Sequence, residues 1–242
     1  MPRVTSTQTG AAVAQLVIDP VEWRDLAQDI AAAGGRLLAL WGTNRGGQRD
    51  TVHAVAIAPP RVLLISFAIA DDTSHCPGVE DVFPSASRMQ RAMFDLCGLR
   101  STGHDARPWL RHAAWPRDAF PLAANPMPSS PQTPIDDYAF VRVEGDGVHE
   151  IAVGPVHAGI IEPGHFRFSV VGEKVLRLEE RLGYVHKGIE RRFAELPILD
   201  GHRLAARVSG DSGVAYAWSY CQALERMTGI TVPQRASWLR AL

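Results

Sequence analysis

The chain has 242 residues and a formal net charge of −1, so it lacks the basic surplus that nucleic-acid binding requires. Apolar residues make up 46% and charged residues 21%, an ordinary globular composition that is sufficient for a sizeable core. The sequence shows no apolar run long enough to cross a bilayer and no signal-peptide core at its N-terminus. Three scattered cysteines, Cys76, Cys97 and Cys221, predict free thiols in a reducing compartment.

The first predicted element is a helix that begins after Asp19. Asp19 is a good N-cap, Pro20 suits the first helical position, and Glu22 completes a capping-box pattern. One apolar stripe then follows the helical period: Trp23, Leu26, Ala27, Ile30 and Ala31. Gly34 and Gly35 are expected to end this helix.

Three strand-like runs come next, at residues 36–41, 52–58 and 61–69. Their short connections, rich in glycine and proline, favour antiparallel neighbours. A second helix is predicted over about residues 87–97, where apolar residues recur at helical spacing up to Gly98. The rest of this domain is punctuated by proline and is expected to be irregular, with three aromatic anchors: Trp109, Trp115 and Phe120.

Residues 123–137 contain four prolines and two serines, which predicts a linker. The expected domains are therefore 1–122 and 138–242. In the second domain, strands are predicted at residues 138–143, 149–153, 166–171 and 174–178. Helical spacing starts near His186, and a helix that is apolar on two faces starts at Gly213. The sequence thus predicts an α+β fold: a helix with an antiparallel sheet, then a small sheet leading into the first helices of a bundle.

The segment 83–99 carries a compact pattern of charged and aromatic residues. Its members are Arg91, Phe94, Asp95 and Gly98, followed by His104, Trp115, Pro116 and Phe120-Pro121-Leu122. This pattern resembles the signature of the thirty-kilodalton subunit of respiratory complex I. Gln90 and Ala92 stand where that family has glutamates, and Cys97 replaces a bulky aromatic. The family subunit is a docking element without a cofactor, so the resemblance implies attachment rather than chemistry.

Four further motifs follow in order between residues 151 and 242. They are Gly154-Pro-Val-His157, Glu162-Pro-Gly-His165-Phe-Arg-Phe168, Leu182-Gly-Tyr-Val-His-Lys-Gly-Ile-Glu190 and Ala223-Leu-Glu-Arg-Met-Thr-Gly-Ile-Thr-Val-Pro-Gln-Arg235. Together they resemble the forty-nine-kilodalton subunit of complex I and the large subunits of energy-converting nickel–iron hydrogenases, the hydrogenase-4 and formate hydrogenlyase branch. An ordered series of motifs is more specific than a single match.

The segment 207–212 reads Arg-Val-Ser-Gly-Asp-Ser and resembles the start of the core helix in nickel–iron hydrogenase large subunits. That family reads R-x-C-G-x-C, and its two cysteines hold the metal. Ser209 and Ser212 occupy those two positions here. Their hydroxyls stay protonated at neutral pH and are hard, weak donors, so no metal site is predicted. The chain is expected to bind no cofactor itself, and an iron–sulfur cluster is expected in a partner subunit.

The resemblance makes His157 a candidate for a quinone or proton contact, and Glu162 a candidate for proton transfer. His165 and Asp211 are further catalytic candidates. Gly210 stands where complex I has a tyrosine that completes its quinone cavity, which disfavours quinone reduction. Structural alternatives remain open: His157 as a partner of backbone groups in a turn, Glu162 and His165 as turn residues, and Ser209, Asp211 and Ser212 as helix-start residues.

These features predict a non-nickel subunit of a complex I-like, hydrogenase-related membrane oxidoreductase complex. It would dock an iron–sulfur subunit and couple electron transfer to ion translocation, peripheral on the cytoplasmic face of the inner membrane, and it is not expected to be catalytic alone. Expected partners are an iron–sulfur subunit of the complex I twenty-kilodalton type, membrane-arm subunits and the rest of the large subunit, with no nucleic acid. The alternative is a structural or assembly protein, or a truncated large-subunit fragment whose last helices leave an apolar face uncovered.

Overall fold

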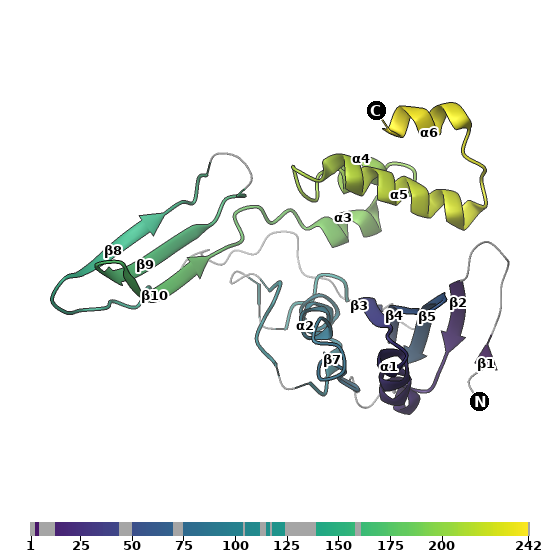
Figure 1. Ribbon diagram of the computed structural model, residues 1–242, viewed down its shortest axis with the longest axis horizontal. Helices are drawn as coiled ribbons and strands as arrows, with labels where there is room; N and C mark the ends of the chain where they lie inside the picture. The colour runs from purple at the N-terminus through teal and green to yellow at the C-terminus, as the bar shows by residue number, and fades with distance from the viewer. Residues whose placement is uncertain are drawn as a thin grey trace. The chain divides into compact units, whose positions relative to one another are not determined.

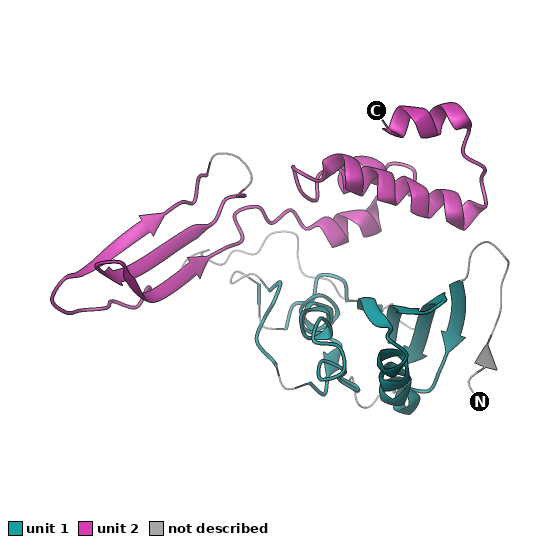
Figure 2. Cartoon of the chain, viewed as in Figure 1, with its two compact units in different colours: residues 1–137 teal, residues 138–242 magenta. Residues whose placement is uncertain are grey.

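The protein was analysed as a computed structural model that describes nine stretches of the chain. These are residues 3–4, 13–43, 50–69, 75–103, 105–111, 115–116, 118–123, 139–157 and 161–241. The chain forms two compact units, residues 1–137 and 138–242, which Figure 2 colours separately. Helices and largely antiparallel sheets occur in both units, which confirms the predicted α+β class. His104 and almost all of the predicted linker lie outside the described residues.

The sheet of unit 1 has the strand order β1-β2-β5-β4-β3 (Figure 1). Its strands are β1 (Arg3–Val4), β2 (Val13–Val17), β3 (Arg36–Thr43), β4 (Thr51–Ala58) and β5 (Arg61–Ala68). β4 pairs antiparallel with both β3 and β5, as predicted. The strands β1 and β2 were not predicted. β2 pairs parallel with β5, and Leu16 lies opposite Ile65. Such a pairing depends on a crossover that local patterning does not reveal.

The first helix begins as the sequence predicts. The Asp19 carboxylate accepts from the Val21 N–H at 3.0 Å, and the Glu22 carboxylate accepts from the Asp19 N–H at 3.0 Å. This capping box opens a 3₁₀ turn, η1 (Pro20–Glu22), that continues into α1 (Trp23–Ala32). Trp23 is fully buried, and its ring centroid lies 5.6 Å from that of Phe67 on β5. The capped helix is thereby fixed to the sheet through its apolar stripe.

The second helix, α2 (Ala86–Cys97), packs against β3. Gly42 on β3 makes this contact possible, because a Cβ there would lie 2.6 Å from the Leu99 side chain and 3.0 Å from that of Met93. The Cys97 thiol donates to the Gly42 carbonyl at 3.3 Å. Burial raises the pKa of Cys97 to about 11 and that of Cys76 to about 12, so both remain thiols. All three cysteines are free, as predicted.

One hydrophobic core lies between the sheet of unit 1 and its two helices. Its larger members are Trp23, Ile30, Leu37, Leu40, Val52, Ile65, Phe67, Val79, Phe83, Met93 and Leu99. A buried side chain of this size contributes about 1.5–3 kcal/mol relative to an exposed one, so this core carries the stability of unit 1. A short parallel ladder, β6 (His75–Cys76) with β7 (Arg100–Ser101), joins the end of α2 to the chain that precedes it.

Unit 2 begins with an antiparallel sheet of β8 (Val148–Val153), β9 (His165–Val171) and β10 (Lys174–Arg181). Three of the four predicted strands are present, but the strand predicted at 138–143 is wrong, because residues 139–143 form no strand. The Val141 N–H donates to the Glu179 carboxylate at 3.2 Å instead. Glu179 is 6% exposed. The Val141 N–H therefore bonds to a buried carboxylate side chain, whereas a strand would have bonded it to the backbone of a neighbouring strand.

The helices of unit 2 are α3 (Ile189–Glu195), α4 (Gly201–Ala205), α5 (Gly213–Thr228) and α6 (Gln234–Ala241). The long helix from Gly213 was predicted, and α4 was not. α4 packs against α5, where a Cβ at Gly201 would lie 2.2 Å from the Tyr220 hydroxyl oxygen. That hydroxyl donates to the Ile198 carbonyl at 2.6 Å. Gly201 therefore allows the two helices to approach closely.

Neither α5 nor α6 contains a buried residue. Val214 is 79% exposed, Met227 75% and Trp238 67%. An ion pair between Glu225 and Arg240 joins the two helices, and the Arg240 guanidinium lowers the pKa of Glu225. Among the described residues, no helix is both long enough and apolar enough to cross a membrane.

Two neighbouring glycines after α1 should tolerate alanine differently. Gly34 has a left-handed φ of +73° with nothing within 4 Å of its Cβ position, whereas a Cβ at Gly35 would lie 2.3 Å from the Ile57 carbonyl oxygen. Gly34→Ala should therefore cost about 1 kcal/mol of unfolding free energy, and Gly35→Ala about 3 kcal/mol. Urea denaturation of the full chain measures both. Equal losses would contradict the close approach at Gly35.

Candidate functional site

Asp95 on α2 is a carboxylate that is only 1% exposed. Its Oδ2 accepts hydrogen bonds from the backbone N–H groups of Trp109 at 2.7 Å, Leu110 at 2.7 Å and Arg111 at 3.2 Å. Residues 105–111 have no regular secondary structure that would satisfy these donors. The buried carboxylate therefore accepts the hydrogen bonds that a neighbouring strand or a helical turn would otherwise accept. Asp95 fixes this irregular segment to α2.

Arg91 lies one helical turn before Asp95, on the same face of α2. Its guanidinium donates to the Arg107 carbonyl at 2.6 Å, to the Asp105 carboxylate at 3.1 Å and to the Pro108 carbonyl at 2.8 Å. The side chain is only 13% exposed. Arg91 and Asp95 thus act as a pair: the arginine binds carbonyls of the segment and the aspartate binds its N–H groups.

The C-terminal end of α2 is closed by Phe120. Its ring centroid lies 5.5 Å from that of Phe94. Gly98 has a left-handed φ of +79°, and a Cβ there would lie 3.1 Å from the Phe120 ring. The Leu122 N–H also donates to the Leu96 carbonyl at 2.8 Å. The prediction of Phe120 as an anchor is thereby confirmed, and Gly98 is needed both for the helix end and for this contact.

Trp109 differs from the anchor that the sequence predicts, because it is 47% exposed. The guanidinium carbons of Arg88 and Arg91 lie 5.0 Å and 5.3 Å from its ring centroid. These distances are within the range of cation–π attraction. Trp109 is therefore a surface residue stacked with arginines rather than part of the core.

Gln90 explains one departure from the complex I signature. It is 3% exposed, its Oε1 accepts from the Val79 N–H at 2.9 Å, and its Nε2 donates to the Glu80 carboxylate at 2.8 Å. A carboxylate at position 90 has no proton to donate at neutral pH and would face Glu80 directly. The neutral amide of Gln90 is therefore compatible with a glutamate at position 80, whereas a second carboxylate would not be.

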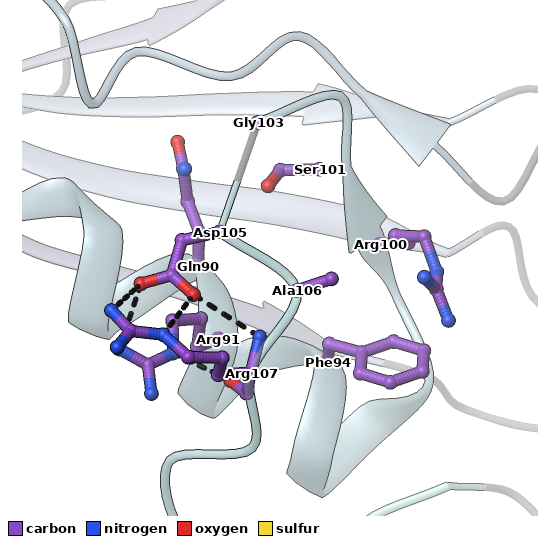
Figure 3. A pocket seen from close by; sticks show the side chains of 9 residues that line it. All are labelled: Gln90, Arg91, Phe94, Arg100, Ser101, Gly103, Asp105, Ala106 and Arg107. Carbon is purple, nitrogen blue, oxygen red and sulfur yellow. Dashed lines mark hydrogen bonds and ion pairs between the residues drawn. The ribbon is translucent and has the colours of Figure 1, made fainter.

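A pocket of about 50 Å³ opens between α2 and the segment that follows it (Figure 3). It is lined by Gln90, Arg91, Phe94, Arg100, Ser101, Gly103, Asp105, Ala106 and Arg107. Asp105 lies on one side, bonded to Arg91 and to Arg107, and the Arg107 guanidinium holds the pKa of that carboxyl well below its usual range. Arg100 lies on the other side, 4.2 Å from the centroid of the Phe94 ring. The sequence did not predict this pocket.

In unit 2 the loop between β8 and β9 brings together three of the predicted site residues. His157 Nε2 donates to the Gly164 carbonyl at 2.9 Å, and His165 Nδ1 lies 3.3 Å from the Gly154 carbonyl. The Gly164 N–H also donates to the Pro155 carbonyl at 3.1 Å. The two histidines therefore brace the two ends of the loop against each other. Because Nε2 of His157 is the donor, its Nδ1 is the atom available for another partner.

Glu162 is exposed in the same loop, between the two histidines in sequence. Asp211 is exposed just before α5. Within the described part of the chain, no hydrogen bond or ion pair joins Asp211 to His157, Glu162 or His165. The structure thus places His157 and Glu162 in the β8–β9 loop and His165 at the start of β9, and it leaves Asp211 with the helices.

Ser209 and Ser212 lie at the start of α5. Ser212 is the N-cap of that helix, although its side chain makes no capping hydrogen bond. Both residues are half-buried. A nickel ion of the hydrogenase type requires soft thiolate ligands, and two neutral hydroxyls do not supply them. These residues do not fit such a metal. No cluster of three or more His, Cys, Asp or Glu side chains that could hold a metal occurs among the described residues.

Residues 16–127 match the family described as "Respiratory-chain NADH dehydrogenase, 30 Kd subunit". The chain is 33% identical over 189 residues to hydrogenase-4 component G of Escherichia coli (strain K12), covering 74% of this chain and 34% of that protein. It is 34% identical over 224 residues to formate hydrogenlyase subunit 5 of the same strain, covering 86% and 39% respectively. It is also 25% identical over 184 residues to the C/D subunit of the NADH-quinone oxidoreductase of Phocaeicola vulgatus, covering 69% and 36%.

These relationships confirm the resemblances found in the sequence. Coverage of 86% of this chain in one alignment necessarily includes parts of both units. The chain spans between a third and two fifths of the length of these three relatives.

Asp95→Asn should destabilise the chain by about 2–3 kcal/mol, because a neutral amide replaces a carboxylate that accepts three N–H groups in a buried site. Guanidinium denaturation of the full chain measures this loss. Asp29→Asn is the matched control, since Asp29 is exposed on α1, and it should change the unfolding free energy by less than about 0.5 kcal/mol. Comparable unfolding energies for the two variants would show that Asp95 does not hold the segment.

Proposed function

The chain belongs, through residues 16–127, to the family of the 30 kDa subunit of respiratory-chain NADH dehydrogenases, and on this basis we propose that it is a subunit of a complex I-like, hydrogenase-related membrane oxidoreductase complex. In this role it docks an iron–sulfur subunit and contributes to the coupling of electron transfer to ion translocation. It carries no nickel. Its place is peripheral, on the cytoplasmic face of the inner membrane, against subunits of the membrane arm.

Two observations together carry this proposal. The homology extends into both units, and serine occupies both positions at which the hydrogenase family has its metal-binding cysteines. The match to formate hydrogenlyase subunit 5 reaches beyond the 30 kDa domain. Ser209 and Ser212 remove the soft ligands that a nickel site needs. A chain that is homologous to these subunits but lacks the metal ligands is suited to docking and coupling rather than to hydrogen chemistry.

Unit 1 supports a docking role through the way its signature residues are used. Arg91 and Asp95 are occupied by backbone groups of the following segment, and Gly98 makes room for Phe120. The signature residues therefore hold the segment after α2 in place and so shape the surface of unit 1. Protein interfaces are enriched in exposed tryptophan and arginine, and the segment that these residues hold presents Trp109 beneath Arg88.

Unit 2 supports the coupling role through the β8–β9 loop. His157 is the candidate for contact with a quinone or a proton, since the bond from Nε2 to Gly164 leaves Nδ1 available. Glu162 supplies an exposed carboxylate in the same loop. We infer that a quinone, if bound, would be held by this chain together with its partners, because Glu162 is exposed in this loop.

The first test is purification of the chain with its complex from the native host. We expect co-purification with an iron–sulfur subunit of the 20 kDa type and with membrane-arm subunits. Metal analysis should find iron in the complex and no stoichiometric nickel associated with this chain. The isolated chain should contain neither metal. Stoichiometric nickel on the isolated chain, or a chain recovered alone from gently solubilised membranes, would refute the proposal.

A structural or assembly role is the second candidate, and the exposure of α5 and α6 favours it. Helices without a buried residue suit a chain that is stabilised by the rest of a large subunit, whether this chain is a separate protein or a fragment. Gly210 also supports this candidate, because the family's cavity tyrosine is absent although a Cβ there would meet nothing within 4 Å.

The double variant His157→Ala, Glu162→Gln separates the two candidates. If the loop takes part in coupling, electron transfer by the fully assembled complex should fall roughly tenfold or more, as expected for loss of a proton-transferring group. The matched control is His149→Ala, Glu173→Gln, which changes an exposed histidine on β8 and an exposed glutamate in the turn between β9 and β10. Full activity of the assembled double variant would favour the structural role.

A further inference from the structure

The pocket beside α2 has an unequal distribution of charge. Three arginines and one aspartate line it. Asp105 is neutralised within the pocket, because Arg107 donates to it at 2.8 Å and Arg91 at 3.1 Å. Arg91 also donates to the backbone carbonyls of Arg107 and Pro108. Of the three arginines that line the pocket, Arg100 is the one that makes no ion pair with Asp105.

The Arg100 guanidinium is exposed and lies 4.2 Å from the centroid of the Phe94 ring. Among the residues that the structure describes, its N–H groups make no hydrogen bond or ion pair. Stacking on an aromatic ring orients the planar guanidinium and leaves its edge free, which is the geometry that binds a carboxylate with two parallel hydrogen bonds. The Ser101 hydroxyl lines the same pocket.

The neighbouring surface extends this arrangement. Arg88 is exposed, and its guanidinium carbon lies 5.0 Å from the centroid of the Trp109 ring. Arg91 contacts that ring from the pocket side at 5.3 Å. We call the surface formed by Arg88, Arg91, Arg100, Arg107 and Trp109 the basic strip. It carries a surplus of positive charge and a half-exposed tryptophan, and both features are typical of protein interfaces.

The size of the pocket limits its occupant. A volume of about 50 Å³ admits a carboxylate group but not a mononucleotide or a cofactor, which occupy sites of several hundred Å³. We propose that the basic strip binds an acidic segment of a partner subunit, and that one aspartate or glutamate side chain of this segment enters the pocket and pairs with Arg100. This inference rests on the proposed docking function and names the surface that performs it.

The test uses the full chain and two synthetic peptides, one carrying four glutamates and the other the same peptide with glutamines. Binding is followed at low salt by nuclear magnetic resonance of the arginine Nε–Hε signals. We expect the acidic peptide to shift the Arg100 signal, the glutamine peptide to leave it unchanged, and added salt to weaken binding. Arg100→Gln should weaken binding roughly fivefold, as expected for loss of one partly exposed ion pair.

Two further variants serve as controls. Arg61→Gln removes an exposed charge elsewhere in unit 1 and should leave affinity unchanged. Arg100→Lys keeps the charge without the planar fork and should give intermediate affinity. If Arg100→Gln does not fold, this lysine variant and the two wild-type peptide titrations still decide the outcome. Equal binding of both peptides, or an equal effect of Arg61→Gln, would overturn the proposal. So would Arg100-dependent binding to anionic vesicles without binding to the acidic peptide.

The proposed function and this inference fail separately. If the chain co-purifies with its complex and Arg100→Gln leaves both assembly and peptide binding unchanged, the docking function stands and the basic strip is excluded. If the acidic peptide binds through Arg100 but the chain joins no membrane complex, the strip stands and the proposed function fails.

Discussion

The Asp95 carboxylate is the interaction on which the surface of unit 1 depends. It is buried and accepts three consecutive backbone N–H groups from a segment without regular structure. Arg91, one turn earlier, binds carbonyls of the same segment. Without this pair, the segment would expose unsatisfied peptide groups and lose the conformation that shapes the pocket. A few kcal/mol at one helix face therefore determine the shape of the surface that is available for docking.

This arrangement gives α2 two separate tasks on two faces. Its apolar face, with Met93 and Cys97, packs against β3 and belongs to the core. Its polar face, with Arg91 and Asp95, holds the following segment in place. The complex I signature thus has a physical explanation in this chain that requires no chemistry of its own. Gln90 fits the same account, since its amide links the Val79 backbone to Glu80 where a glutamate would repel it.

Unit 2 differs from unit 1 in how its apolar residues are placed. Its sheet and helices expose large apolar side chains, and the residues that resemble catalytic ones brace a loop or start a helix. Serines at the thiolate positions are compatible with this role, because hydroxyls bind soft metals poorly. Unit 1 therefore has a core and a formed surface of its own, whereas the exposed apolar residues of unit 2 suit an element that is completed by partners.

The sequence alone determined the elements with strong local signals and the family. The capping box at Asp19, the apolar periods of both helices in unit 1, the three antiparallel strands and the ordered motifs of unit 2 all depend on near neighbours or short spacings. Local patterning did not reveal the parallel strand β2, and it wrongly predicted a strand at 138–143. The sequence placed Arg91 and Asp95 in a signature, but only the tertiary structure showed which groups they bind. The reason is physical: their partners lie 14 to 17 residues further along the chain, in a segment with no pattern of its own, and such contacts are decided by packing rather than by propensity.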